Sequence, residues 1–130
     1  TMIDYGFYKE LDKTFAEAAE IILPKLEEFG FTIVSQIDLK EKFKQKLDID
    51  FKEYTILGLC DPQSAYNAVM KEENIGLMLP CNMIVYEKDD KTAVVVMKPK
   101  SAMETLGNKE LDDVACEVEH KLKKLFDSIE

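Results

Sequence analysis

Alternating apolar and polar side chains along the chain predict five β-strands. Successive side chains of a strand point to opposite faces, so a half-buried strand alternates in character. Ile3, Tyr5 and Phe7 begin this pattern. The third run, residues 51–60, is apolar on both faces, as a central strand would be. A hairpin turn, Asp89-Asp90-Lys91, separates the last two runs. The pattern predicts strands over residues 2–9, 31–37, 51–60, 83–87 and 92–97.

Apolar side chains that recur every three or four residues predict a long first helix. Thr14 and Glu17 have the spacing of a capping box, in which each side chain satisfies a free backbone N–H at the helix start. The apolar stripe continues to residue 29, where Gly30 can end the helix in the left-handed conformation. Pro24 lacks an N–H and its ring clashes with the preceding turn, so we expect a kink or a break near residues 21–23.

Three further helices are expected. Asp38 is placed to cap a short helix over residues 39–47. Asp61 and Pro62 combine a favoured N-cap with the residue best suited to the first helical position, so a second main helix begins there. The strongest apolar stripe of the chain predicts a final helix over residues 111–129.

This order of elements predicts an α+β fold with a largely antiparallel sheet of about five strands. Strands and helices do not alternate regularly, as they would in a doubly wound fold. We expect the helices to cover one face of the sheet and to leave the other face for a partner. The 130 residues contain no linker or repeat, so residues 1–130 are expected to form one domain.

Charge and composition limit the partners that we expect. The formal net charge of −9 produces a long-range field that repels phosphate backbones and anionic membrane surfaces. We therefore expect neither nucleic acid nor a membrane as a partner, and no apolar run is long enough to span a bilayer. The first twelve residues also lack the basic start and apolar stretch of a signal peptide. The chain has one cluster of basic residues, Lys40, Lys42, Lys44 and Lys46. We interpret it as a solvated helix face with acids nearby.

The cysteines indicate a reducing compartment. Cys60, Cys81 and Cys116 are odd in number and widely spaced, which fits neither a disulfide framework nor a zinc site. We therefore expect reduced thiols, no bound metal and a cytoplasmic protein. His120 is the only histidine and lies beside two glutamates, which indicates a surface residue and excludes a metal site built from several histidines.

Two segments carry a specific resemblance to a known family. YTILGLCDP at residues 54–62 and IGLMLPCN at residues 75–82 resemble the signature of the domain-of-unknown-function 302 family. The flanking Gly30-Phe31, the lysine-rich helix and a late Lys98-Pro99 agree with it, so the similarity covers nearly the whole chain. The family commonly has asparagine where this chain has Asp61; either residue can cap a helix, but aspartate adds a charge beside Cys60.

The resemblance implies an α+β fold similar to the TATA-box-binding-protein-like class and a tendency to form homodimers. It implies no established reaction. It also gives no reason to expect DNA binding, because function belongs to a site rather than to a fold and this chain is acidic.

The candidate reactive and ligand-binding residues lie at the two turns of the signature. Cys60 ends a strand directly before a helix N-terminus, where the free N–H groups can lower a thiol pKa, although the charge of Asp61 opposes this effect. If the strands that carry Cys60 and Cys81 are antiparallel, both thiols lie at one end of the sheet. The candidate ligand-binding residues are Cys60, Asp61, Pro62, Leu79, Pro80, Cys81 and Asn82.

Three functions remain open at this point. The first is a homodimeric binding module that takes a small ligand or an anion in the cleft between the two turns. The second is a thiol-based redox enzyme or carrier that uses Cys60 and Cys81. The third is a structural or protein-interaction domain that uses the exposed sheet or an edge strand. The sequence identifies no catalytic residue and no cofactor, and it leaves open whether the protein is an enzyme.

Overall fold

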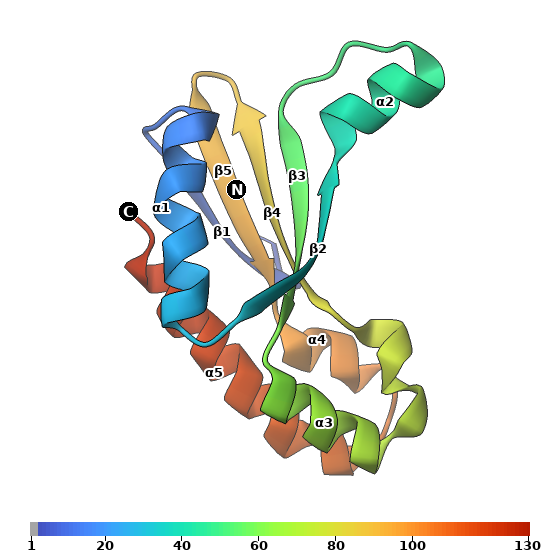
Figure 1. Ribbon diagram of the computed structural model, residues 1–130. Coiled ribbons are helices and arrows are strands. Elements are labelled where there is room, and N and C mark those ends of the chain that lie inside the picture. Colours follow the sequence, from blue (N-terminus) through green and yellow to red (C-terminus); the bar gives the residue numbers. More distant parts are fainter. Residues whose placement is uncertain (1–2) are drawn as a thin grey trace.

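Five antiparallel strands form one sheet with helices packed against it (Figure 1). The computed structural model describes residues 3–130. The strand order β1-β5-β4-β3-β2 puts β1 and β2 at the edges, and every neighbouring pair is antiparallel. The predicted α+β class and five-stranded antiparallel sheet are therefore confirmed. The main elements are β1 (Gly6–Leu11), α1 (Phe15–Glu28), β2 (Thr32–Asp38), α2 (Leu39–Leu47), β3 (Tyr54–Cys60), α3 (Pro62–Lys71), β4 (Cys81–Lys88), β5 (Lys91–Met97), α4 (Pro99–Glu104) and α5 (Asp112–Ser128).

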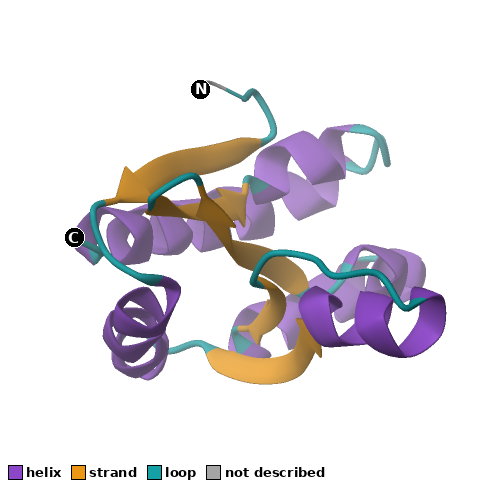
Figure 2. Ribbon diagram, turned by 90° about the horizontal axis from the view of Figure 1, so that it is seen from above, coloured by secondary structure: helices purple, strands orange, loops and turns teal. Residues whose placement is uncertain are grey.

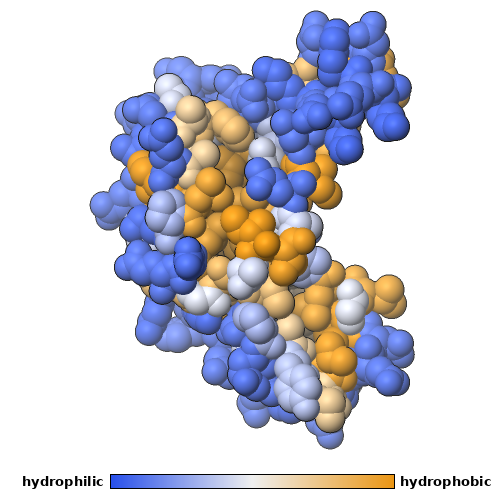
Figure 3. All heavy atoms as spheres, in the orientation of Figure 1, coloured by the Kyte–Doolittle hydropathy of each residue, from blue (hydrophilic) through white to orange (hydrophobic). Residues whose placement is uncertain are grey.

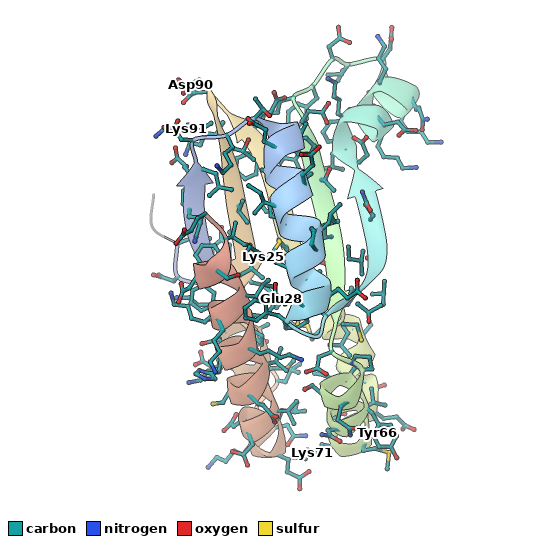
Figure 4. The ribbon with its side chains drawn as sticks, turned by 60° about the vertical axis from the view of Figure 1, so that its left-hand side comes forward. Lys25, Glu28, Tyr66, Lys71, Asp90 and Lys91 are labelled. Carbon is teal, nitrogen blue, oxygen red and sulfur yellow. The ribbon has the colours of Figure 1, made fainter. Side chains whose placement is uncertain are left out.

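Helices α1 and α5 cover one face of the sheet, which we call the covered face (Figure 4). In Figure 4, α1 with Lys25 lies in front of the strands and runs along them, while α3 with Tyr66 lies at the end away from the β4–β5 turn at Asp90. Leu122 of α5 and Ile22 of α1 are fully buried there, as the periodic stripes predict. The strands contribute alternate residues to the same core, among them Leu57, Leu59, Met83, Val85, Val94 and Val96.

Helix α1 begins and ends as its sequence predicts. The Thr14 and Glu17 capping box is present in both directions, and Gly30 follows the helix with a φ of +83°. The predicted break did not occur, because α1 continues through Pro24 without interruption. Pro24 and the residue one turn before it, Glu20, both lie on the exposed side, so water can satisfy the carbonyl that loses its N–H partner.

Two predicted strands begin later than expected. The first was predicted over residues 2–9; Met2 lies outside the described residues, and β1 runs instead from Gly6 to Leu11. The side chain of Ile3 folds onto the start of that strand, 3.0 Å from where a Cβ on Gly6 would lie. The third strand begins at Tyr54 rather than at Phe51, because the Phe51 ring turns away to pack on α2.

Helix α2 stands away from the sheet, on the side opposite to α1 (Figure 2). Asp38 caps it as predicted, since its carboxylate accepts a hydrogen bond from the Glu41 backbone N–H at 3.1 Å. No residue of α2 is buried. It packs on the segment that follows it, because the Phe43 and Phe51 rings meet edge to face with their centroids 5.1 Å apart. We call α2 and the following residues 48–53 the arm.

The opposite end of the molecule consists of α3, α4 and the first turns of α5 (Figure 1). Helix α4 was not predicted, because six residues are too few for a periodic pattern. Its start is held by Glu119 of α5, whose carboxylate accepts a hydrogen bond from the Lys100 N–H at 3.1 Å. A 3₁₀ segment, Glu73–Met78, links α3 to β4. Among residues 3–130, no helix is long and apolar enough to cross a membrane.

Candidate functional site

The two turns of the signature lie side by side. Strands β3 and β4 are antiparallel neighbours, and their register places Leu59 opposite Cys81 and Gly58 opposite Asn82. The end of β3 and the start of β4 therefore meet at the end of the sheet that faces α3. Both signature cysteines lie at this end, as expected for antiparallel strands.

A cavity of about 250 Å³ opens beside these turns. Four of the seven candidate residues line it, namely Cys60, Asp61, Leu79 and Pro80. The other walls come from three helices and the edge strand, and their residues include Val34 from β2, Ala65 and Ala68 from α3, Met103 from α4, and Val114 and Ala115 from α5. Nearly all of these groups are apolar, so the cavity has an apolar wall.

The remaining three candidates do not line the cavity. Pro62 occupies the first turn of α3, where its missing N–H costs nothing. Cys81 is buried on the covered face, beside its register partner Leu59. Asn82 points to the other face and is exposed. These residues build the strand–helix junctions rather than the cavity wall.

Asp61 precedes α3, but its carboxylate is not hydrogen-bonded as a helix cap. It accepts a hydrogen bond from the Ser64 hydroxyl at 3.0 Å and another from the Lys121 ammonium, also at 3.0 Å. Burial alone would raise the pKa of this carboxyl, but these two hydrogen bonds and the Lys121 charge outweigh it, so the pKa falls below its ordinary value. The start of α3 therefore already holds a negative charge, which opposes the binding of an anion there.

Lys121 joins three elements at this end of the cavity. From α5 it reaches Asp61 before α3, lies over the Phe31 ring at 4.8 Å, and comes within 3.5 Å of the Gly30 carbonyl oxygen after α1. A Cβ on Gly30 would lie 2.8 Å from the Lys121 Nζ, which shows how closely the lysine approaches the backbone here. The sequence analysis missed this lysine, because no local pattern relates it to a carboxylate 60 residues earlier.

Gly58 allows the second turn to close against β3. A Cβ at this position would come within 2.6 Å of the Pro80 Cγ and would also clash with the Ser35 hydroxyl. Pro80 follows a cis peptide bond after Leu79, and its ring forms part of the cavity wall. The close approach of the proline ring explains why this strand position is a glycine.

The sequence matches a family model whose description is "Domain of unknown function DUF302" over residues 7–129. The chain belongs to this family. No curated protein matches the sequence. A solved structure described as "Crystal structure of uncharacterized conserved protein DUF302 from Bacillus stearothermophilus" matches with a TM-score of 0.89 at 24% identity. The match covers 97% of this chain and 98% of that chain, so the two proteins share their fold.

The cysteines of this DUF302 domain differ in their surroundings. All three are free: Cys60 is half-buried in the cavity wall, Cys81 is buried and Cys116 is exposed on α5. Burial, together with the nearby Cys60 and Asp61, raises the pKa of Cys81 to about 11. Consecutive strand residues face opposite sides, so Cys60 points away from the side that Leu59 shares with Cys81. Such directions oppose a Cys60–Cys81 disulfide.

Within residues 3–130, no group of three or more histidine, cysteine or acidic side chains could hold a metal ion. The cavity beside the two signature turns of this DUF302 domain is lined almost wholly by apolar residues. Its back wall, formed by α4 and α5, was not anticipated from the sequence.

Proposed function

We propose that this DUF302 domain is a binding module for a small apolar molecule, which occupies the cavity beside the Cys60–Pro62 and Leu79–Asn82 turns. The observation that carries the proposal is an open cavity of about 250 Å³ whose walls are almost wholly aliphatic. At about 30 Å³ for each water-sized or methylene-sized group, it has room for roughly eight such groups. A ligand with an alkyl chain or ring system of that size would fill it.

The polar groups of the cavity indicate which ligand head group would be tolerated. The Asp61 carboxylate and the Ser64 hydroxyl already bind each other, and the carboxylate also binds Lys121. A neutral hydroxyl or an ammonium group can approach this carboxylate, whereas a ligand carboxylate or phosphate meets like charge in a poorly solvated place. We therefore favour a neutral or cationic ligand over the anion that a helix N-terminus alone would suggest.

The thiol-based alternative receives less support. With a pKa of about 11, Cys81 remains a thiol at neutral pH, and only thiolates are effective nucleophiles. Cys60 lies in the cavity wall, and its side chain points away from the side of the sheet that carries Cys81. The reducing cytoplasmic compartment stays a prediction.

We also propose that the domain is a homodimer, as the family resemblance implies. The support is a sheet whose second face has no helix packed across it within the described residues (Figure 1). Light scattering should give about twice the chain mass of 14.9 kDa. A mass of one chain at high micromolar concentration would refute the dimer without affecting the cavity proposal.

Binding can be tested with a fluorescent apolar probe and three competitors of equal chain length. N-phenyl-1-naphthylamine should brighten on addition of the protein, and 1-octanol and octylamine should displace it. Octanoate should compete at least about tenfold more weakly, because its carboxylate is repelled by Asp61. Asp61→Asn should reduce that difference. Equal competition by all three compounds would contradict the assignment of the head group.

A matched pair of substitutions tests the location. Ala115 lines the cavity on α5, whereas its neighbour Cys116 is exposed on the same helix. Ala115→Phe should fill the cavity and abolish probe binding, and Cys116→Phe should leave binding unchanged. If the Ala115→Phe protein folds and binds the probe with wild-type affinity, the cavity is not the site.

A further inference from the structure

The two helices of the covered face leave one side of the sheet without a helix across it. A helix is about 10 Å wide and neighbouring strands lie about 4.8 Å apart, so two helices cover about four strands. Helix α5 lies over the β1 edge, where the Phe126 and Phe7 rings are 5.8 Å apart. Figure 4 shows α1 in front of the middle of the sheet and the edge strand β2, in cyan, to one side of both helices. Within residues 3–130, no helix therefore lies across the covered face of β2.

This part of the covered face forms an apolar groove between α1 and β2, which we call the α1–β2 groove. It contains two depressions, of about 70 Å³ and about 290 Å³, and Leu23 of α1 lines both. The smaller one is also lined by Ala19 and Leu57, and the larger one by Phe31 and Ile33. Leu23 is 43% exposed, so it forms a ridge between the two depressions. Figure 3 shows a band of apolar residues, in orange, between α1 and β2.

The α1 side of the groove is acidic. Glu27 is the only charged residue among the described residues that line the two depressions. Glu20 lies three residues before Leu23 and Glu27 lies four residues after it, so the three side chains share one side of the helix. Neither glutamate forms an ion pair within residues 3–130. The groove therefore combines an apolar floor with two uncompensated carboxylates on its rim.

The basic residues nearest to the groove do not neutralise this rim. Lys25 is the only lysine of α1, and at two residues from Leu23 it lies about 200° away around the helix. Strand β2 contains no basic residue. Lys121 lies over the Phe31 ring at the end of the groove, but it is paired with Asp61 at 3.0 Å.

We infer that the α1–β2 groove binds a positively charged amphipathic helix of a partner protein, which lies beside α1 and completes the layer of helices over the sheet. The ridge and its two depressions accept apolar side chains that are one or two helical turns apart, at about 6 to 10 Å. The acidic rim favours lysine or arginine on the flank of that helix. Charge and shape therefore select the same kind of partner.

A helix fits this position better than an extended chain. An extended chain would pair with the free edge of β2 and would leave the depressions on the face of the sheet empty. Helix α1 has 14 residues and is about 21 Å long, so a partner helix of about four turns can lie along all of it. Packed helices lie about 8 to 10 Å apart, which places the partner over β2 and β3. No residue lines both this groove and the cavity, so the inference is independent of ligand binding.

The test measures, by fluorescence anisotropy, the binding of a fluorescein-labelled peptide of leucine and lysine with the apolar spacing of a helix and a length of about 15 residues. The wild type should bind it with a dissociation constant below about 50 μM. A peptide of the same composition in which leucine and lysine alternate has the pattern of a strand, and it should bind at least about tenfold more weakly. Stronger binding of the alternating peptide would indicate pairing with the β2 edge and would overturn the inference.

A matched pair of substitutions tests the location. Leu23→Lys replaces the apolar ridge with a positive charge and should weaken binding of the helical peptide by at least about 30-fold. Val69→Lys is the control, because Val69 is 39% exposed on α3 and the change in net charge is the same. Its dissociation constant should stay within about threefold of the wild type.

A charge swap tests the acidic rim. Glu20→Lys combined with Glu27→Lys should weaken binding of the leucine–lysine helix by at least about tenfold. The same double variant should gain binding of a leucine–glutamate helix, which the wild type does not bind. Glu104→Lys combined with Glu117→Lys, at exposed positions of α4 and α5, changes the net charge equally and should do neither. Equal effects of the two double variants would show that the peptide responds only to the net charge of −9, which would overturn the inference.

The remaining outcomes separate the groove from the other proposals. A wild type that does not bind the leucine–lysine helix overturns the inference and leaves the cavity proposal intact. Displacement of N-phenyl-1-naphthylamine by the peptide would place the peptide in the cavity and would also overturn it. Dissociation of a wild-type dimer by Leu23→Lys would show that a second copy covers the groove instead. All variants should bind N-phenyl-1-naphthylamine as the wild type does, and if Leu23→Lys fails this check of folding, the charge swap decides.

Discussion

Burial of Cys81 predicts a loss of stability at alkaline pH that one substitution should abolish. The thiol is 8% exposed and its pKa rises from 9.0 to about 11, chiefly because the folded protein desolvates it and secondarily because of Cys60 and Asp61. Below pH 9 the thiol is protonated in both the folded and the unfolded chain, so its contribution to stability is fully present. Between pH 9 and about pH 11 the unfolded chain ionises and the folded one does not.

The size of the effect follows from the two pKa values. Each unit of difference corresponds to about 1.4 kcal/mol. The free energy of unfolding should therefore fall by about 2–3 kcal/mol through Cys81 alone as the pH rises from 9 to 11, and this loss should level off above the folded pKa. Lysines and tyrosines titrate in the same range, so the wild type must be compared with Cys81→Ala, which retains all of them.

Urea unfolding in the presence of reductant, at several pH values from about 8 to about 11.5, measures the difference. The substitution itself costs stability at every pH because it empties buried space. The gap between the two proteins should shrink by about 2–3 kcal/mol across the range. Cys116→Ala, at an exposed cysteine, should follow the wild type. A gap between wild type and Cys81→Ala that stays constant with pH would show that Cys81 is not desolvated in the folded state.

Three other substitutions test the framework around the site. Leu122→Ala should lower the free energy of unfolding by about 2–5 kcal/mol, since Leu122 is fully buried between α5 and the sheet, and an unchanged melting temperature would remove it from the core. Lys9→Met should cost about 1–3 kcal/mol in denaturant unfolding, because the Lys9 ammonium donates hydrogen bonds to the carbonyl oxygens of Phe126 in α5, at 2.8 Å, and of Ile129 just after it, at 2.7 Å. Gly58→Ala should cost about 1–3 kcal/mol and weaken probe binding, because its methyl group displaces the Pro80 ring; unchanged stability and binding would contradict this close contact.

Much of the fold could be predicted from the sequence because burial on one face imposes a period on the chain. Helices α1 and α5 were found from their stripes, and the strands of the β4–β5 hairpin from their turn. The helix ends at Thr14 and Gly30 were found because satisfying free backbone groups requires particular residue types there. Errors arose where a side chain contacts something outside its own element, as Ile3 and Phe51 do.

The candidate site was only partly predictable, for a related reason. Its front wall lies in the two signature turns, where Cys60 and Pro80 are close to residues with recognisable turn chemistry. Its back wall depends on how α5 crosses the end of the sheet, and that crossing has no local pattern. Lys121 looks like an ordinary exposed lysine of an amphipathic helix until the fold brings it to Asp61. Contacts between segments that are distant in the sequence therefore determine which residues surround the cavity.

The cavity itself provides a way to separate a binding role from a folding role. Each cubic ångström of empty apolar space in a core costs about 24 cal/mol, so a cavity of this size is a sizeable loss of packing even after allowance for its opening to solvent. A domain selected only to fold would gain by filling it with larger side chains. Ala115→Phe should therefore keep or raise the melting temperature while it abolishes probe binding. A protein that loses stability in step with binding would instead indicate that Ala115 is packed tightly and that the space around it is too small for a ligand.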